Sequence, residues 1–568
     1  MERGRATQRQ QLLDRVLLYH EQTKHGSQSY ARSLGRMDWA TQPNPFRHYP
    51  GARLDLLPQS TPYSKTFGER SYDQVYLDSC PPEPLNRDTL STFFYYSLAL
   101  SAWKESGQSS WSLRVNPSSG NLHPTEAYLI AGPVSELTES PMVAHYDPYH
   151  HGLEERIQVS VAEWNQLSGE LPNGSFLMGL TSIHWRESWK YGERAYRYCQ
   201  LDLGHAFGCL QFAAMALGWE LRAVESFSPS QIEVLCGVSA QKGIEKEEGA
   251  CLLAVLPRGQ FPPERQPVLR CGEGFFRTLN ARVWKGVPNV LSPSHHEWPI
   301  IPFVCEAVEN GEWTPEKESP FSNEPGMPME ACRGKDRSRT LAQVVRGRRS
   351  AVAMDGQTIF SADDFYRLLW RLHPRLNPTF FRRAAGERHA ALVLFVHRVS
   401  GVEPGLYVCC RSPSQRKTLA SCLRDDFEWS DPVGCPPELD LHLLKRGDFQ
   451  ECSQTLSCHQ SIAADGAFAV SILAEFREPL QGQGPGLYPR LFWEAGELGQ
   501  MMYLEAEAAG LQATGIGCFL DDGVHELLGI SDRSWQSLYH FTIGGGVKDE
   551  RITTRSAYHH LMPRVMES

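Results

Sequence analysis

The sequence lacks several features that would each indicate a particular class of protein. No stretch approaches the roughly 18 apolar residues that a membrane-spanning helix needs, and the first residues are charged rather than apolar, unlike a secretory signal. No basic block exceeds a few residues and the formal net charge is -10, which argues against binding nucleic acid through phosphates. The 15 cysteines contain no CxxC pair. We therefore expect a cytoplasmic protein with free thiols, no metal site, and neither a membrane nor a nucleic-acid partner.

What is present is an ordinary folded composition in an unusually long chain. Hydrophobic residues make up 41% and charged residues 21% of 568 residues. One hydrophobic core rarely organises so many residues, so the length predicts two large domains or several smaller ones.

Residues 116–124 read NPSSGNLHP and lead into the apolar segment 125–130, which is typical of a strand. Prolines stiffen this loop, and it offers two hydroxyls, an amide and several backbone N–H groups within a short span. These groups suit a planar polar heterocycle or its sugar-alcohol chain. The alternative interpretation is a plain Pro/Ser/Gly turn before a strand.

Other segments have simpler interpretations. Apolar content predicts a buried helix over 90–103, and longer helices over 185–217 and 491–509 that stop at Gly218 and Gly510. Residues 145–151 indicate a hairpin, whose three histidines we interpret as turn and surface residues rather than metal ligands. Residues 288–339 are rich in Pro, Glu, Ser and Gly, as linkers are.

The two halves of the sequence repeat. An offset of 292 residues superimposes Gly204 on Gly496 without gaps in the following segment. At this offset, identical residues recur at core and cap positions: Ala214 and Ala506, Ala216 and Ala508, Gly218 and Gly510, Phe227 and Phe519, Leu235 and Leu527, Gly237 and Gly529, Ser239 and Ser531. Such a run predicts a duplicated domain.

The two halves differ at the segments that could bind a ligand. Residues 514–519 read TGIGCF, whereas 222–227 read RAVESF, and only the two glycines would let backbone approach a flat ligand. The PSSGN loop occurs only in the first half, and the Arg-Arg-Ser segment 348–350 only in the second. Each half therefore holds a different part of what we interpret as one site.

With these motifs the chain resembles the nitroreductase superfamily of FMN enzymes, in particular the SagB/ThcOx-type dehydrogenases that oxidise azolines. The resemblance covers about 90–259 and 341–551, and its most specific element is the loop at 116–126. It implies an α+β fold of two tandem nitroreductase-like domains, each a mixed, largely antiparallel sheet flanked by helices. Family members are usually homodimers with flavins at the subunit interface, so the duplication implies a pseudo-dimer within one monomeric chain. The expected parts are an N-terminal helical and coil extension (1–85), domain 1 (86–287), a linker (288–339) and domain 2 (340–568).

The resemblance also implies the site residues. It assigns the flavin loop to Pro117, Ser118, Ser119 and Asn121. It assigns phosphate binding to Arg348, Ser350, Lys548 and Arg551. The turn that faces flavin atom N5 falls on Gly515, Ile516 and Gly517. A third basic position of the family falls on Val352. Because the complementary elements are missing from the opposite halves, we expect one FMN per chain.

Lys190 and Tyr191 match the Lys-Tyr pair that azoline oxidases use in proton removal. A lysine whose pKa is lowered by burial, beside a phenol, can act as general base or acid during hydride transfer. At the 292-residue offset the second half has Gly482 and Gln483, so only the first half supplies the pair. The alternative is that both are surface residues at a helix start.

The sequence thus favours an FMN-dependent oxidoreductase that moves a hydride through flavin N5, to or from a small organic or peptide-derived substrate. One alternative is an NAD(P)H-dependent nitro- or quinone reductase. No dinucleotide-binding fingerprint is visible, so NAD(P)H would have to stack in the flavin pocket. A non-catalytic flavin-binding or scaffold protein is the third interpretation.

Overall fold

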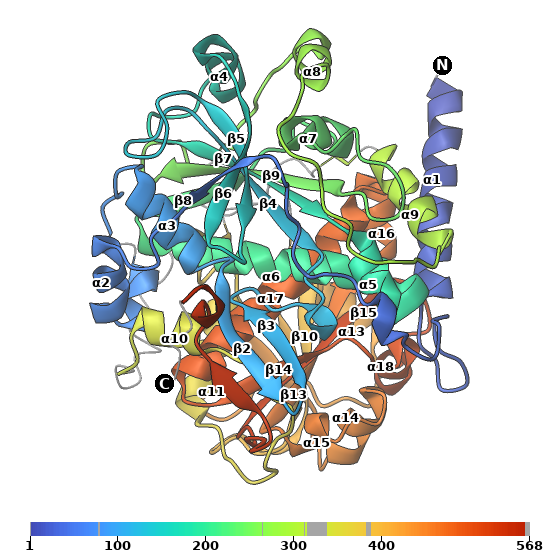
Figure 1. Cartoon of the computed structure of the whole chain (residues 1–568). Coiled ribbons are helices and arrows are strands. Elements are labelled where there is room, and N and C mark those ends of the chain that lie inside the picture. Colours follow the sequence, from blue (N-terminus) through green and yellow to red (C-terminus); the bar gives the residue numbers. More distant parts are fainter. Residues whose placement is uncertain are drawn as a thin grey trace.

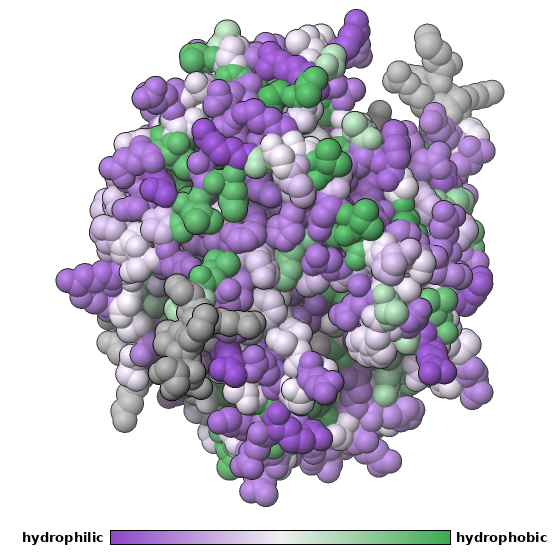
Figure 2. All heavy atoms as spheres, in the orientation of Figure 1, coloured by the Kyte–Doolittle hydropathy of each residue, from purple (hydrophilic) through white to green (hydrophobic). Residues whose placement is uncertain are grey.

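The computed structural model describes residues 2–77, 80–263, 265–311, 313–314, 338–381 and 388–562. Two antiparallel sheets lie on either side of a central pair of long helices (Figure 1). No helix among the described residues is long and apolar enough to cross a membrane. Figure 2 shows hydrophilic residues over most of one face, with apolar residues scattered in small groups.

The first sheet has seven strands in the order β1-β6-β5-β4-β7-β9-β8. Every described pairing in it is antiparallel. Its strands are β1 (Arg53–Leu56), β4 (Thr125–Ala131), β5 (Met142–Asp147), β6 (Gly152–Gln158), β7 (Phe176–Ser182), β8 (Trp219–Ala223) and β9 (Glu248–Pro257). The N-terminal extension therefore contributes an edge strand, β1, to this sheet.

The second sheet has six strands in the order β12-β11-β10-β13-β15-β14, again antiparallel. Its strands are β10 (Ala390–Val396), β11 (Gly405–Cys410), β12 (Asp440–Arg446), β13 (Phe468–Glu475), β14 (Gln512–Ile516) and β15 (Trp535–Gly544). Without β1, the first sheet has the order β6-β5-β4-β7-β9-β8. In both sheets the six strands, taken in the order in which they occur in the chain, therefore have the same spatial order.

Two 22-residue helices, α6 (Ala195–Ala216) and α17 (Leu487–Ala508), pack against each other across the middle of the molecule (Figure 1). They cross at Gly204 and Gly496. A Cβ added to Gly204 would lie 2.8 Å from Gly496 Cα, and one added to Gly496 would lie 3.0 Å from Gly204 Cα. The close approach of the two helices therefore requires both glycines.

A small third sheet joins distant parts of the chain. The hairpin of β2 (Leu100–Ser106) and β3 (Ser109–Arg114) pairs with β16 (Thr553–Arg555), near the end of the described chain. In Figure 1 this hairpin reaches down over the second half. A hairpin of the first half thus lies beside elements of the second half.

The remaining helices connect and cover the sheets. The α-helices are α1 (Glu2–Gln22), α2 (Pro62–Glu69), α3 (Arg87–Tyr95), α4 (Val161–Ser168), α5 (His184–Tyr191), α7 (Pro229–Cys236), α8 (Glu273–Asn280), α9 (Ile300–Glu309), α10 (Leu341–Gly347), α11 (Ala362–Leu372), α12 (Pro378–Phe381), α13 (Pro413–Cys422), α14 (Gln450–Leu456), α15 (Ile462–Asp465), α16 (Arg477–Gln483) and α18 (Asp521–Leu528). Short 3-10 helices are η1 (Trp39–Thr41), η2 (Tyr72–Leu77), η3 (Ser119–Asn121), η4 (Gly192–Arg194) and η6 (His559–Leu561).

Several expectations are corrected by the fold. The segment 90–103 was predicted as one helix. In the structure the helix α3 ends at Tyr95, and the strand β2 begins at Leu100 and pairs with β3. The predicted helix 185–217 breaks at Gly192, whose φ of +57° is left-handed and whose added Cβ would lie 2.7 Å from Ser33 Cα. Helix α9 lies within the predicted linker, of which residues 312 and 315–337 fall outside the described chain.

The hairpin at 145–151 is present as β5, a turn and β6. Its histidines are not all surface residues, because His145 and His151 are fully buried. His145 lies between Glu126 and Glu154, and these two carboxylates raise its pKa to about 9 although burial alone would lower it.

Candidate functional site

A cavity of about 600 Å³ lies between the two halves. This volume falls within the range of about 300–1,000 Å³ that is usual for cofactor and small-molecule sites. Its lining comes from both halves: the β2–β3 hairpin, the loop 117–123, α5 and α6 from the first, and residues 348–352, α17, β14 and residues 546–549 from the second.

The loop 117–123 forms one wall and is held in a strained backbone conformation. Gly120, Asn121 and His123 all have positive φ angles, between +52° and +60°. A Cβ on Gly120 would lie 2.7 Å from the Tyr191 hydroxyl oxygen, so the glycine is required here both for its φ and for the space. The Asn121 side-chain amide is hydrogen-bonded within the protein: its nitrogen donates to the Ser112 carbonyl, and its oxygen lies 2.9 Å from His123 Nε2.

Two buried carboxyl groups anchor this loop to α5 and α6. The Ser119 backbone N–H and hydroxyl each donate to Asp202 Oδ1 at 3.0 Å, and the Ser118 hydroxyl donates to Glu187 Oε1 at 3.4 Å. Burial raises the pKa of Asp202 to about 7, against the hydrogen bonds from Ser118 and Ser119, which lower it. Burial, and then the charge of Asp202, raises the pKa of Glu187 well above its usual range. The pair therefore holds at least one proton near neutral pH.

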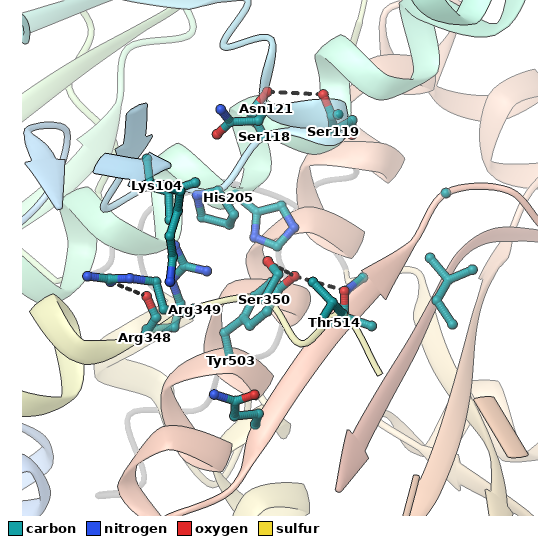
Figure 3. A pocket seen from close by; sticks show the side chains of 18 of the residues that line it. Lys104, Ser118, Ser119, Asn121, His205, Arg348, Arg349, Ser350, Tyr503 and Thr514 are labelled. Carbon is teal, nitrogen blue, oxygen red and sulfur yellow. Dashed lines mark hydrogen bonds between the residues drawn. The ribbon is translucent and has the colours of Figure 1, made fainter. Parts of the chain in front are cut away.

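Positive charge gathers at one side of the cavity. Lys104, Arg348 and Arg349 lie together there, away from Thr514 (Figure 3), and Lys548 also lines the cavity. Burial and the neighbouring cations Arg349 and Lys548 lower the pKa of Lys104. Burial and then Arg348 lower the pKa of Arg349 to about 10. Carboxylates among the described lining residues are Asp202, across the cavity, and Asp549, which Arg551 engages at 2.8 Å.

Arg348 is the best-placed of these cations to receive an anion. Its side chain is buried, its guanidinium lies 4.9 Å above the Tyr503 ring, and one nitrogen donates to the Arg114 carbonyl at 3.3 Å. Its Nε is buried without any hydrogen-bond partner. An unpaired buried donor is costly, and a phosphate oxygen would satisfy it.

Ser350, Tyr503 and Gly515 form the wall beside β14. Ser350 Oγ and the Gly515 N–H both contact the Tyr503 hydroxyl, at 2.9 Å each. A Cβ on Gly515 would collide with the Tyr539 hydroxyl, and one on Gly517 with the Tyr198 ring. The two glycines thus make room for tyrosines that line the cavity.

The structure brings most of the predicted site residues to this cavity. Its lining includes eleven of them: Pro117, Ser118, Ser119, Asn121, Tyr191, Arg348, Ser350, Gly515, Ile516, Gly517 and Lys548. The position Val352 also lines it. Lys190 lies next to it, with Nζ 3.0 Å from the Cβ position of Gly120 and 5.3 Å from the centre of the Tyr191 ring. Arg551 does not line the cavity, and its side chain is 85% exposed.

Sequence reasoning missed several lining residues: Lys104, Arg114, Tyr198, Asp202, His205, Tyr503 and Tyr539. Lys104 lies on β2 (Leu100–Ser106), whose first residues fall in the segment 90–103 that was predicted as a helix, so this strand and its lysine were not recognised. Asp202 stands in a long apolar helix, where a lone buried carboxylate is itself a signal of a polar partner.

A second, smaller cavity of about 300 Å³ lies at the positions related by the 292-residue offset. Gly517 and Tyr198 of the first cavity correspond to Glu225 and Arg490, and here these form a bidentate ion pair. The Arg490 guanidinium also lies 3.6 Å from the Trp313 ring centre. Trp313 Nε1 donates to Gln483, the counterpart of Tyr191, at 3.2 Å.

Known proteins resemble both the sequence and the fold. Residues 406–545 match the model of the nitroreductase family. No curated protein sequence matches the chain. The structure of a candidate nitroreductase from Anabaena variabilis is similar over 94% of this chain and 99% of its own, with 19% identity and a TM-score of 0.64.

Two other solved structures match smaller parts. A candidate nitroreductase from Ralstonia eutropha covers 43% of this chain and 92% of its own, at 18% identity and a TM-score of 0.24. The E. coli microcin synthetase McbBCD complex covers 32% and 65%, at 18% identity and a TM-score of 0.25. With the family model and the Anabaena structure together, residues 406–545 form a nitroreductase-family domain in a chain that has the fold of a nitroreductase.

Proposed function

We propose that this chain is an FMN-dependent oxidoreductase with a single flavin site between two fused nitroreductase-like halves. The observation that carries the proposal is the large cavity, where a cluster of cations from both halves faces the glycine-containing loop of the first half. The nitroreductase-family domain at 406–545 supports an oxidoreductase.

The residues present fit FMN. Arg348, with its unpartnered buried Nε, together with Arg349, Lys104 and Lys548, would hold the phosphate. The loop 117–121 and the strand end 515–517 would flank the ring system. When bound, FMN supplies hydride exchange at N5, and the residues of this chain bind and orient it and manage protons.

A duplication of one ancestral domain best accounts for the two halves. Shifted by 292, the bounds of α6 and α7 fall on those of α17 and α18, and the two sheets share one strand order. The helices cross at the corresponding residues Gly204 and Gly496. This supports a pseudo-dimer within the chain, with the second flavin position closed by Glu225 and Arg490.

Within this class we favour SagB/ThcOx-type dehydrogenation of a small organic or peptide-derived substrate. Lys190 and Tyr191 lie against Gly120 of the proposed flavin loop, where a base is needed when a hydride leaves an adjacent carbon. The Glu187 and Asp202 pair lies beneath the same loop and would take up or return the proton.

Ligand titration tests the cofactor. The chain, freed of bound flavin, is titrated with FMN and with riboflavin, and fluorescence quenching reports binding. Because the cations would contact the phosphate, which riboflavin lacks, FMN should bind at least about 10-fold more tightly, the effect of one charge-assisted hydrogen bond. Equal affinities, or no binding of either, would contradict the proposal.

Electron donors separate the reaction classes. Anaerobic bleaching of the flavin by NADPH or NADH would favour the reductase alternative, whereas bleaching by an azoline-containing peptide would favour the dehydrogenase. Replacement of Lys190 by Ala should then slow that bleaching with little change in FMN affinity. An unchanged rate would remove Lys190 from the mechanism.

A further inference from the structure

A cluster of two histidines and an aspartate lies outside the proposed flavin cavity. His48 Nδ1 and His150 Nδ1 are 3.3 Å and 2.5 Å from the same oxygen, Asp147 Oδ2. The three ligand atoms all lie within 4.8 Å of one another. Asp147 and His150 lie in the hairpin whose histidines we interpreted as turn and surface residues rather than metal ligands, and His48 lies about 100 positions before them.

The cluster is held by its surroundings. Asp147 ends β5, is fully buried, and its other oxygen accepts the backbone N–H of Tyr149 at 2.8 Å. The backbone of His48 is bonded on both sides to Asn289, at 2.9 Å and 3.0 Å. The side chain of His150 is 35% exposed, so that a ligand can enter from its side.

We propose that His48, Asp147 and His150 form a binding site for a divalent transition-metal ion such as Zn²⁺. Two imidazole nitrogens and one carboxylate oxygen are a ligand set for Zn²⁺, Co²⁺ or Ni²⁺, whereas Ca²⁺ and Mg²⁺ prefer oxygen alone. Tetrahedral zinc with bonds of about 2.0–2.1 Å separates its ligand atoms by about 3.3 Å. The distance from His48 to Asp147 already has this value, and the half-exposed His150 needs to move back by less than 1 Å.

The fourth position is open to water. To bind the metal ion, each Nδ1 gives up the proton that it shares with Asp147. That proton moves to Nε2 of the same ring when the ring is neutral, and passes to solvent when the ring is charged. No redox step is involved. The site therefore binds metal more weakly in acid, where the histidines are protonated.

The site lies where three segments of the chain meet. His48 belongs to the N-terminal coil, Asp147 and His150 to the β5–β6 hairpin, and His560 of the C-terminal segment contacts the Tyr149 carbonyl at 3.0 Å. Two residues before His48, Phe46 packs under the guanidinium of Arg114, a lining residue of the large cavity. A bound metal ion would therefore restrict the motion of the coil around His48, which packs against the cavity residue Arg114 through Phe46.

Metal titration of the full chain tests the proposal without any reference to flavin. After removal of metal by a chelator, Zn²⁺ is added and binding is followed by calorimetry, with Co²⁺ absorption as a second reading. We expect one strong site per chain. His150→Gln and Asp147→Asn should each weaken it at least about 100-fold, because three protein ligands become two.

His295→Gln is the matched control, since His295 pairs with a single carboxylate, Glu245, at 2.7 Å, and lies outside the cluster. It should leave the strong site unchanged. Because His150 is half-exposed, its replacement by Gln keeps the test decisive if Asp147→Asn unfolds. Absence of a strong site, or a strong site that survives His150→Gln, would overturn the proposal.

Discussion

Gly517 and Tyr198 in the large cavity occupy the same places in the duplicated pattern as Glu225 and Arg490 in the small one. In the large cavity a glycine leaves room for a tyrosine ring. In the small one a carboxylate and a guanidinium close on each other, with Trp313 stacked on the guanidinium. The same backbone frame thus supports an open site on one side and a filled one on the other. We infer that two side-chain changes, with the cap of Trp313, account for much of this difference.

Making the open site resemble the filled one should have the largest effect. Gly517→Glu introduces the residue found at position 225, and its Cβ alone already collides with the Tyr198 ring. The Glu side chain would occupy part of the cavity and displace the Tyr198 ring, so FMN affinity should fall by at least about 100-fold. Fluorescence titration measures the change.

Gly274→Glu is the control, because no atom lies within 4 Å of a Cβ added there. It should bind FMN like the unmodified chain. If Gly517→Glu, folded by circular dichroism, bound FMN within about threefold of the unmodified chain, the comparison of the two cavities would be wrong.

Arg348 sharpens the comparison further, because the small cavity has no unpaired arginine among its described lining residues. Arg348→Met should weaken FMN about 10- to 100-fold, since charged hydrogen bonds contribute roughly 1.5–3 kcal/mol. Riboflavin affinity should change little.

Arg551→Ala is the matched test of the other predicted phosphate cation. Its side chain lies outside the cavity on Asp549, so we expect less than about a twofold effect. A larger loss from Arg551→Ala than from Arg348→Met would reverse the assignment.

The carboxyl pair beneath the loop 117–123, Glu187 and Asp202, should make the stability of the chain depend on pH. Asp202 keeps its proton to about pH 7 when folded, whereas in the unfolded chain it ionises near pH 4. The folded state therefore binds more protons between these values, and its stability falls as pH rises through this window.

Asp202→Asn should flatten that fall, measured by urea unfolding at several pH values. Asp363→Asn, at an exposed position, should leave the slope as it is. An unchanged slope in Asp202→Asn would mean that Asp202 is ionised in the folded chain.

Opening the filled site should have the smallest effect. Glu225→Ala breaks an ion pair whose side chains are 18% and 22% exposed. We expect a loss of about 1–2 kcal/mol in the free energy of unfolding, between the values for exposed and buried pairs. Lys65→Ala, in an exposed pair with Glu69, should cost less than about 0.5 kcal/mol.

Glu225→Ala should leave the amount of bound flavin unchanged. The described lining of the small cavity still has no loop like 117–121, and Trp313 still lies on the Arg490 guanidinium, 3.6 Å from its ring centre. A second flavin in this variant would contradict our account of why the site is closed.

The sequence was informative where one local pattern sufficed. The repeat at 292 residues predicted helices that the structure places at corresponding bounds, and the loop 117–121 and the segment 348–350 do meet at one cavity. Lys104 could not be found in this way, because its place depends on a hairpin that crosses to the other half. The break at Gly192 depends on a distant contact with residue Ser33, which no local pattern reveals.

The glycines of 515–517 have tertiary contacts that the local sequence does not show. We expected them to admit a flat ligand, but their Cβ positions face the rings of Tyr539 and Tyr198. Likewise the hydroxyl of Ser119 is bonded to a buried carboxylate of α6. In the first case tyrosine rings occupy the space beside the glycines, and in the second a carboxyl group accepts the serine hydroxyl. Neither partner can be recognised from the local sequence.

Flavin stoichiometry tests the central claim most directly. The chain is saturated with FMN, freed of excess ligand and denatured, and the released flavin is measured against protein by absorbance. Our account predicts one FMN per chain, lost in Gly517→Glu and kept in Glu225→Ala. Two FMN per chain, or none under any condition of loading, would contradict it.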